Sequence, residues 1–380
     1  MADRKSKDSE SSSNNQSTNS KNISGMNRRA YVVAGGAALT SLAGCLGGSG
    51  GGGSEDTVTA AWVYDGSVND QGWVKAHDEG RKAAEEEFDW LETLSQESVG
   101  AEESQRVISD YAETADIVFT NSAIFEDSTA AVAEEYPDTY FENGFGLTTS
   151  DNLSRYTLKT HQARYAIGVA AGLLTESNEL GFISAFELPQ VVREANAFAL
   201  GAQSVNPDVT VTPRLVGAFI APQECTSVVN SFAEDGIDVA TAFMNTPATP
   251  SAAAENNIWG TGTGYWDQSD SGGDWYVGGG VLLWGNYYTS RVQAVRDGTW
   301  EPQDYWAGVA EDVVDLGPFG PEVPDDVISE SQDALSAIGS GDLDMWEGTK
   351  FEGESDAPGG FIETEMPSYV EGIDGTIEEL

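Results

Sequence analysis

Val58-Thr59-Ala60-Ala61-Trp62-Val63-Tyr64 is a short apolar run that is followed by turn residues and then, from Gly72 to Phe88, by a longer amphipathic segment. A continuous apolar run of this length is typical of a strand that is buried on both faces. In the segment after it, Ala, Val and Trp recur on one face and acidic residues on the other, which predicts a surface helix. A strand, a loop and a helix in this order form the first unit of a parallel sheet.

The same alternation continues along the chain. Further strands are predicted at 117–120, 139–142, 180–184, 209–216 and 239–243, and further helices at 128–135, 161–174, 190–205, 222–234 and 249–255. Such alternation is typical of parallel sheets that helices cover on both faces. The rhythm changes near 143–160, and the chain is longer than one core usually holds. We therefore expect an α/β fold with two Rossmann-like lobes.

In folds of this class, ligands bind where the carboxyl ends of the parallel strands meet. The loops that follow the predicted strands are the places to examine for a binding site. They are expected at 65–73, 121–127, 184–189, 244–249 and 260–267.

The first of these loops, 65–73, holds acidic, amide and aromatic side chains. Asn69 or Asp70 can cap the helix that follows, a structural role that contributes about 1 kcal/mol. Trp73 can pack into the core, or it can present its ring to the cleft as a stacking platform, which contributes roughly 1–3 kcal/mol per base. In the second case Asp65, Asn69 and Asp70 are placed to bond the polar edge of a flat ring. The residues alone leave both interpretations open.

The beginning of the chain has the layout of an export signal. Paired arginines at 28–29 precede a run of Val, Ala, Gly and Leu that ends in the tetrapeptide 42–45, Leu-Ala-Gly-Cys. This order is typical of a signal peptide, and the paired arginines indicate the twin-arginine route. We expect 1–45 to be a leader with cleavage before Cys45 and a lipid on its thiol, and 46–56 to be a Gly/Ser tether. The protein would then lie on the extracellular face of the cell membrane. The alternative is a stray thiol in a flexible tail.

The chain is strongly acidic, with 63 Asp and Glu against 18 Lys and Arg, a formal net charge of −45. A field of this sign repels phosphates, so nucleic acid is not an expected partner. At molar salt the Debye length falls to about 3 Å and self-repulsion is largely screened, so the acidity indicates a high-salt habitat. The competing interpretation is an acidic metal-binding surface, but no loop of the EF-hand type is present in the sequence.

The sequence lacks the residue patterns of the common catalytic sites, such as G-x-S-x-G, H-E-x-x-H and the phosphate-binding loop. The two histidines, His77 and His161, each fall inside a predicted helix, where a structural role is favoured over a metal ligand or a general base. Cys225 begins a predicted helix that could stabilise a thiolate, but it has no histidine near it in sequence, so packing is favoured. We therefore expect no enzyme activity, no cofactor and no metal.

Several longer motifs follow one another along the chain. They are Val68-Asn69-Asp70-Gln71-Gly72-Trp73 with His77-Asp78-Glu79-Gly80-Arg81-Lys82, then Arg164-Tyr165-Ala166-Ile167-Gly168, Ser184-Ala185-Phe186-Glu187-Leu188, Asn196-Ala197-Phe198-Ala199-Leu200 and Trp284-Gly285-Asn286-Tyr287-Tyr288. Together, from about Val58 to Trp346, they resemble the basic membrane protein (PnrA-like) family. Its members are substrate-binding lipoproteins that serve ABC importers of purine nucleosides and nucleobases.

The resemblance implies a type I periplasmic-binding fold, in which hinge strands join two lobes that close on the ligand, in a monomer. Lobe 1 is expected at 57–155 and 263–303, lobe 2 at 156–262 and 304–345, and a C-terminal extension at 346–380. The resemblance also implies a binding site in which the purine stacks on Trp73. The other ligand-binding residues expected are Asp65, Asn69, Asp70, Asn121, Ser122, Phe125, Asp127, Phe186, Asn245 and Asp267.

The function that follows is capture of a purine nucleoside or nucleobase-like ligand and its delivery to an ABC permease. A ligand-sensing receptor coupled to a membrane signal transducer is the alternative, and an extracellular nucleoside-processing enzyme is a third hypothesis. Nucleoside-binding members commonly carry a lysine near the segment of Trp284, whereas Val281-Leu282-Leu283 is apolar here. A bare nucleobase or another flat heterocycle therefore stays open as the ligand.

Removing salt tests the meaning of the charge. We expect the protein to unfold on dialysis into dilute buffer, because a net charge of −45 then repels itself without screening. Circular dichroism melts should give a midpoint that rises steeply from dilute to molar salt. A melting temperature that does not change with salt would contradict the screening argument.

Overall fold

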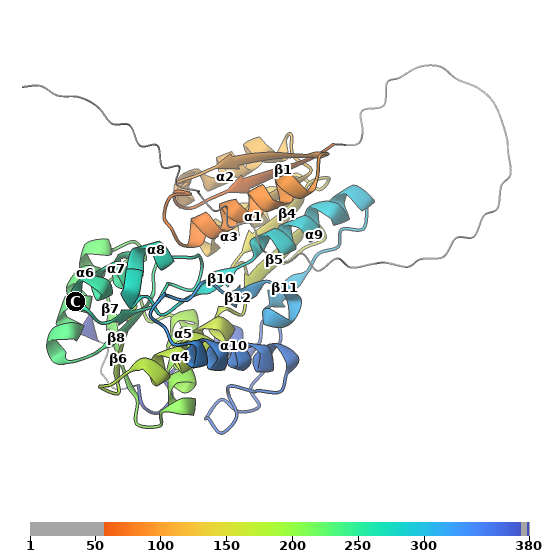
Figure 1. The fold of residues 1–380 in the computed structure, drawn as a ribbon. Helices are drawn as coiled ribbons and strands as arrows, with labels where there is room; N and C mark the ends of the chain where they lie inside the picture. Colours follow the sequence, from red (N-terminus) through yellow and green to blue (C-terminus); the bar gives the residue numbers. More distant parts are fainter. Residues whose placement is uncertain (1–56, 374–377, 380) are drawn as a thin grey trace, which may run out of the picture. The chain divides into compact units, whose positions relative to one another are not determined.

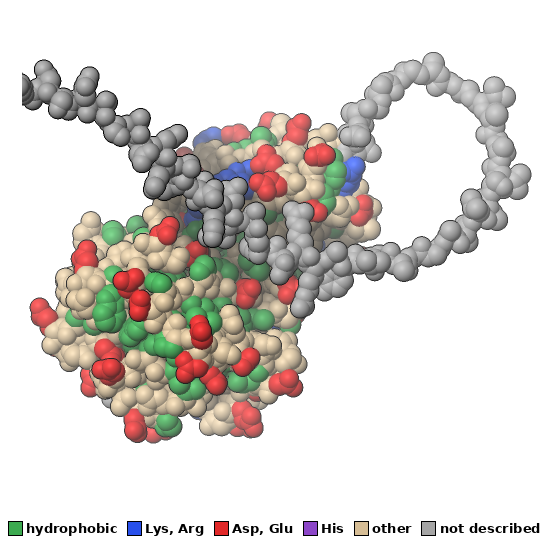
Figure 2. Space-filling model, in the orientation of Figure 1, with side chains coloured by type: hydrophobic (Ala, Val, Ile, Leu, Met, Phe, Trp, Pro, Cys, Tyr) green, Lys and Arg blue, Asp and Glu red, His purple; other side chains and the backbone are tan. Residues whose placement is uncertain are grey.

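The computed structural model describes residues 57–373 and 378–379. The predicted export signal, Cys45 and the Gly/Ser tether lie outside the described residues. Acidic side chains are spread over the visible face of the folded part and do not gather in one patch (Figure 2).

The first sheet has six parallel strands in the order β11-β5-β4-β3-β1-β2. Their bounds are β1 Val58–Val63, β2 Leu91–Gln96, β3 Ile117–Thr120, β4 Tyr140–Gly144, β5 Leu153–Leu158 and β11 Asp304–Ala307. The helices that pack on it are α1 Trp73–Glu87, α2 Ala101–Ala112, α3 Glu126–Glu135 and α9 Trp284–Asp297, with the short η1 Ala123–Phe125 before α3. α1 and α9 lie side by side (Figure 1).

Strand β1 explains why helices cover both faces of this sheet. Trp62 belongs to the core cluster under α1 and α9, where its ring stacks on that of Phe119 with 4.7 Å between centroids. Its neighbours Ala61 and Val63 belong to the cluster under α2 and α3. Successive side chains of a strand point to opposite faces, so an apolar run along β1 needs an apolar partner on each side.

The second sheet has five parallel strands in the order β13-β7-β6-β8-β9. Their bounds are β6 Glu179–Ser184, β7 Thr210–Leu215, β8 Val239–Phe243, β9 Trp259–Gly260 and β13 Glu378–Glu379. The associated helices are α4 Thr160–Leu174, α5 Pro189–Val205, α6 Pro222–Asp235 and α7 Ala248–Asn256, and α10 Asp325–Ser340 packs on α4. Phe182 packs with α5 side chains, while its neighbour Ile183 packs with those of α6 and α7.

A third, two-stranded sheet pairs β10 (Gly280–Leu282) with β12 (Val314–Leu316) in antiparallel fashion. The remaining short elements are α8 Ser269–Gly272, η2 Gly273–Trp275, η3 Val309–Glu311 and α11 Phe361–Thr364. The sequence predicts that the second lobe resumes at 304, but β11 pairs with β5 in the first sheet. The predicted boundary between 155 and 156 likewise falls within β5. β5 and β11 both belong to the first sheet, and only after them does the chain continue to α4 and to β12, respectively. The exact division into lobes stays a prediction.

Most strands and helices predicted from apolar runs are present, and β3 and β8 have the predicted bounds. The prediction lacks β2 and α2, and also later elements such as β5, α9 and α10. β2 reads Leu-Glu-Thr-Leu-Ser-Gln and lies at the sheet edge, where most of its side chains are exposed. An edge strand needs little apolar content, so its sequence carries a weak signal.

The C-terminal segment 342–373 packs on helix α5. Asn196 of that helix accepts a hydrogen bond from the N–H of Val370 at 2.9 Å and donates to the carbonyl of Ser368 at 3.1 Å. Beyond it, the N–H of Val211 in β7 donates to the carbonyl of Gly372 at 2.9 Å. The expected C-terminal extension is therefore an integral part of the second sheet's surroundings.

Helices α4 and α5 approach each other closely at glycine. A methyl group at Gly168 would overlap the carbonyl oxygen of Phe198. We expect Gly168→Ala to lower the free energy of unfolding by about 1–3 kcal/mol, the usual cost of overpacking. Gly100→Ala is the matched control, because nothing lies within 4 Å of a methyl there and its φ is −83°. Urea unfolding at molar salt measures both, and equal stability of the two variants would contradict the close packing.

Candidate functional site

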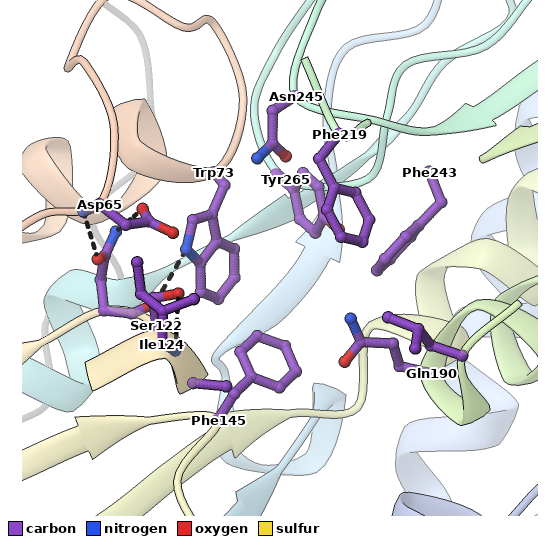
Figure 3. Close-up of a pocket in the computed structure, with 13 residues that line it drawn as sticks. Asp65, Trp73, Ser122, Ile124, Phe145, Gln190, Phe219, Phe243, Asn245 and Tyr265 are labelled. Atoms are coloured by element: carbon purple, nitrogen blue, oxygen red, sulfur yellow. Dashed lines mark hydrogen bonds between the residues drawn. The ribbon is translucent and has the colours of Figure 1, made fainter. Parts of the chain in front are cut away.

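A cavity of about 310 Å³ lies at the carboxyl ends of the strands of both large sheets. It has the size of a small-molecule site. Its lining combines aromatic rings with a few polar groups (Figure 3). The lining residues are Asp65, Trp73, Asn121, Ser122, Ala123, Ile124, Phe145, Leu188, Gln190, Phe219, Phe243, Asn245 and Tyr265.

Trp73, the first residue of α1, is held in one orientation at this cavity. Its indole Nε1 donates a hydrogen bond of 3.0 Å to the carbonyl oxygen of Asn121, at the end of β3. Around it lie Phe145, with ring centroids 5.1 Å apart, and Tyr265, whose ring meets the indole edge to face at 5.4 Å. The indole is thus fixed by a polar bond at one edge while it lines the cavity.

Asp65 and Asn121 bind each other twice at the polar side of the cavity. The amide Oδ1 of Asn121 accepts from the N–H of Asp65 at 3.0 Å, and its Nδ2 donates to Asp65 Oδ1 at 3.1 Å. Burial raises the pKa of the Asp65 carboxyl. A carboxylate held this way offers acceptor oxygens at a fixed position, which suits an N–H or O–H group of a ligand.

Aromatic side chains of the second lobe face these groups. Phe243, the last residue of β8, meets Tyr265 edge to face at 5.2 Å and Phe219 at 6.4 Å between centroids. Asn245 is positioned through its backbone, whose N–H donates to the carbonyl of Phe219 at 2.8 Å. Gln190, in the first turn of α5, adds an amide (Figure 3). The cavity is therefore a flat-sided, ring-rich space with amide and carboxylate groups at its edges.

The structure brings Asp65, Trp73, Asn121, Ser122 and Asn245 together, all of them predicted from the sequence. Their roles in binding stay predictions. The sequence left open whether Trp73 packs in the core or faces the cleft. The residue does both, since it is 6% exposed and still lines the cavity.

In the first lobe, four of the predicted residues do not line this cavity. Asp70 caps helix α1: its carboxylate accepts the N–H groups of Gly72, Val74 and Lys75 at 2.9, 2.9 and 3.0 Å. Asn69 and Asp127 are exposed, and Phe125 is fully buried in the core under α2 and α3.

Phe186 and Asp267 also lie outside the same lining. Phe186 is 44% exposed and packs its edge against Phe219, with 5.8 Å between centroids. Asp267 accepts the N–H of Ser269 at 2.9 Å, at the start of the short helix α8.

The sequence prediction missed most of the aromatic lining. Phe145, Phe219, Phe243 and Tyr265 were not named, although Tyr265 lies in the loop 260–267 that was singled out. Phe243 ends a predicted strand, and that position was the available signal. Phe145 has φ of 55°, a left-handed conformation that places its ring by a turn that no pattern indicates.

The histidines and Cys225 are buried groups. His77 packs behind Trp73 at 4.2 Å between ring centroids, and its Nδ1 lies 2.5 Å from the hydroxyl of Tyr288. Burial holds the pKa of His77, and likewise that of His161, well below the ordinary value. Burial also raises the pKa of the Cys225 thiol to about 11. Within the described residues, no group of His, Cys, Asp and Glu side chains could hold a metal ion.

The sequence of the folded part matches the model of a known family. A model described as "ABC transporter substrate-binding protein PnrA-like" matches residues 57–341. The chain belongs to this family. PnrA-like proteins bind a small molecule outside the cytoplasm and work with the permease of an ABC transporter. Among the helices of residues 57–373, none is long and apolar enough to span a bilayer.

Two similar curated proteins have different ligands in their names. A putative ABC transporter glucose-binding protein of Haloferax volcanii, TsgA13, is 38% identical over 323 residues, which is 85% of this chain and 82% of that protein. A purine-binding protein of Brucella abortus is 33% identical over 298 residues, 78% of this chain and 85% of that one. The relative from a halophile agrees with the acidic composition.

Solved structures confirm the type I fold. A solute-binding protein of an ABC transporter from Conexibacter woesei superposes with a TM-score of 0.66 at 19% identity, over 76% of this chain and 98% of that one. One from Aeropyrum pernix gives 0.64 at 14% identity, over 76% and 92%. At these identities the likeness concerns the fold alone.

Substitutions at Asp70 and at its neighbour Asn69 test whether Asp70 caps helix α1. Asp70→Ala should lower the free energy of unfolding by about 1–2 kcal/mol, because the N–H groups of Gly72, Val74 and Lys75 at the start of α1 lose their acceptor. Asn69→Ala should change it by less than about 0.5 kcal/mol, as is usual for an exposed side chain. Chemical unfolding at molar salt measures both. Similar losses for the two variants would show that Asp70 is not the cap.

Proposed function

We propose that this PnrA-like protein is a solute receptor that closes on a purine nucleoside or nucleobase-like ligand and delivers it to an ABC permease. The observation that carries the proposal is the fixed indole of Trp73, with further aromatic rings from both lobes around one cavity. A flat heterocycle gains stacking on such rings, and stacking does not depend on hydrogen-bond readout.

Polar groups at the rim of the cavity suit the edge of a purine. Asp65 offers acceptor oxygens, and the amides of Gln190 and Asn245 can each both donate and accept. Purine rings carry donors and acceptors around their perimeter, so groups of both kinds are needed. The name of the Brucella abortus relative points to the same ligand class, and that of the Haloferax volcanii relative points to a sugar.

In this proposal the receptor catalyses no reaction. It is a monomer that a lipid on Cys45 holds on the outer face of the cell membrane. Its partners are the ligand and the permease.

Substitution of Trp73 tests the ligand class. We expect Trp73→Ala to weaken binding of a purine by about tenfold or more, because stacking is lost. Trp73→Phe keeps a ring and should lose less, although it also lacks the bond to Asn121. Calorimetric titration at molar salt with adenine, adenosine and glucose measures the effect, and thermal melts verify folding.

The outcomes separate the candidates. Tight binding of glucose with no binding of either purine compound would refute the proposed ligand class. Purine binding that is unchanged in the folded Trp73→Ala variant would refute the stacking role of the indole.

A further inference from the structure

A cavity of about 460 Å³ lies apart from the aromatic one, and among the described residues none lines both. Two segments that follow strands of the first sheet contribute to it, 159–162 after β5 and 310–311 after β11. The rest of its lining comes from the end of helix α10 and from the C-terminal segment 342–373. We call it the C-terminal cavity.

The C-terminal cavity is rich in negative charge. Its carboxylates are those of Glu311, Asp344, Glu354 and Asp356. Lys159 also lines it, but its Nζ is already paired with Asp356 at 2.7 Å. Helix α10 ends here at its cap Gly341, and the end of a helix carries about half a negative unit charge, which offsets the similar positive charge at the start of α4. The cavity therefore attracts a cation and disfavours an anion.

Two of these carboxylates are held in place by the backbone. Asp344 Oδ1 accepts the N–H of Trp346 at 2.9 Å, and Glu311 Oε2 accepts the N–H of Gly308 at 2.8 Å. The side chain of Glu354 is exposed beside them. Acceptor oxygens at fixed positions suit a ligand that carries N–H donors.

Aromatic rings form another part of the lining. Trp346 and Phe351 are 6% and 3% exposed, and their rings meet edge to face with 6.0 Å between centroids. The ring of His161 lies 5.9 Å from that of Trp346. Aromatic faces attract cations, and an apolar body gains free energy when it is buried against them. An organic cation with an apolar body therefore matches both the charge and the rings.

His161 adds a buried polar group without a partner. It lines the cavity, its side chain is 1% exposed, and its Nδ1 makes no hydrogen bond among the described residues. Leaving a buried polar group unpaired is costly, so native proteins rarely do so without a ligand or water. With the imidazole proton on Nε2, Nδ1 is an acceptor, and an N–H group of a cation is the partner that the surrounding charge favours.

We propose that the C-terminal cavity binds a small organic cation that carries N–H donors on an apolar body, such as a protonated primary amine. This second ligand site goes beyond the proposed function, because it lies apart from the aromatic cavity. Trp346, Phe351 and Glu354 lie beyond residue 341, where the family match ends. The C-terminal segment therefore supplies this chain with a site of its own.

Three probes of similar shape separate the contributions of charge and of N–H donors. 2-Phenylethylamine carries both, its N,N,N-trimethyl derivative carries the charge alone, and 2-phenylethanol carries no charge. Calorimetric titration at molar salt should give the highest affinity for the amine. The trimethyl derivative should bind about tenfold more weakly or worse, because it cannot donate to Nδ1 of His161, and the alcohol should bind most weakly.

Substitutions locate the site. His161→Phe keeps a ring and removes the nitrogens, so it should weaken binding of the amine by about tenfold and leave that of the trimethyl derivative unchanged. Glu354→Gln should weaken both cations by about two- to fivefold. Glu347→Gln is the matched control, since Glu347 is exposed in the same segment but outside the lining. Thermal melts verify that each variant is folded.

Several outcomes would overturn the inference. They are failure of all three probes to bind, equal affinity for the alcohol and the amine, unchanged amine binding in folded His161→Phe, and equal losses in Glu354→Gln and Glu347→Gln. Loss of amine binding in Trp73→Ala would also overturn it, because the probe would then occupy the aromatic cavity. Purine binding is measured separately, so the proposed function and this inference can fail independently.

Discussion

The burial of β1 on both faces is the constraint on which the rest of the structure depends. Trp62 needs α1 and α9 above it, and Ala61 and Val63 need α2 and α3 below. Once these helices are in place, the chain must turn from the end of β1 into α1 through residues 64–72. That turn delivers Asp65 and Trp73 to the edge of the sheet, where the end of β3 presents the carbonyl of Asn121. The binding cavity is thus a consequence of how the sheet is covered.

Sequence reasoning succeeded where a residue's position follows from periodicity. The strands at 117–120 and 239–243 are apolar throughout, and their ends locate Asn121 and Asn245. It failed where a polar residue had two possible uses. Asp70 could cap or bind, and its bonds to the N–H groups of Gly72, Val74 and Lys75 show that it caps α1.

Residues far apart in sequence limited the prediction further. Nothing local to His161, Trp346 or Glu354 indicates that the three line one cavity, because that depends on the path of the C-terminal segment. Phe125 shows the opposite error. It follows a strand end, as a ligand-contacting residue would, but the short helix 123–125 turns its ring into the core.

The segment 342–373 also affects the order in which the parts of the molecule can fold. In β7 the N–H of Val211 donates to the carbonyl of Gly372, and β13 pairs with this strand. Asn196 of α5 bonds residues 368 and 370. The first sheet is likewise incomplete without β11, which pairs with β5. Each large sheet is therefore completed by a strand that is synthesised after the others of that sheet. Because β6 to β9 of the second sheet lie between β5 and β11 in the sequence, the first sheet cannot be completed before most of the second has been synthesised, so the two halves mature together.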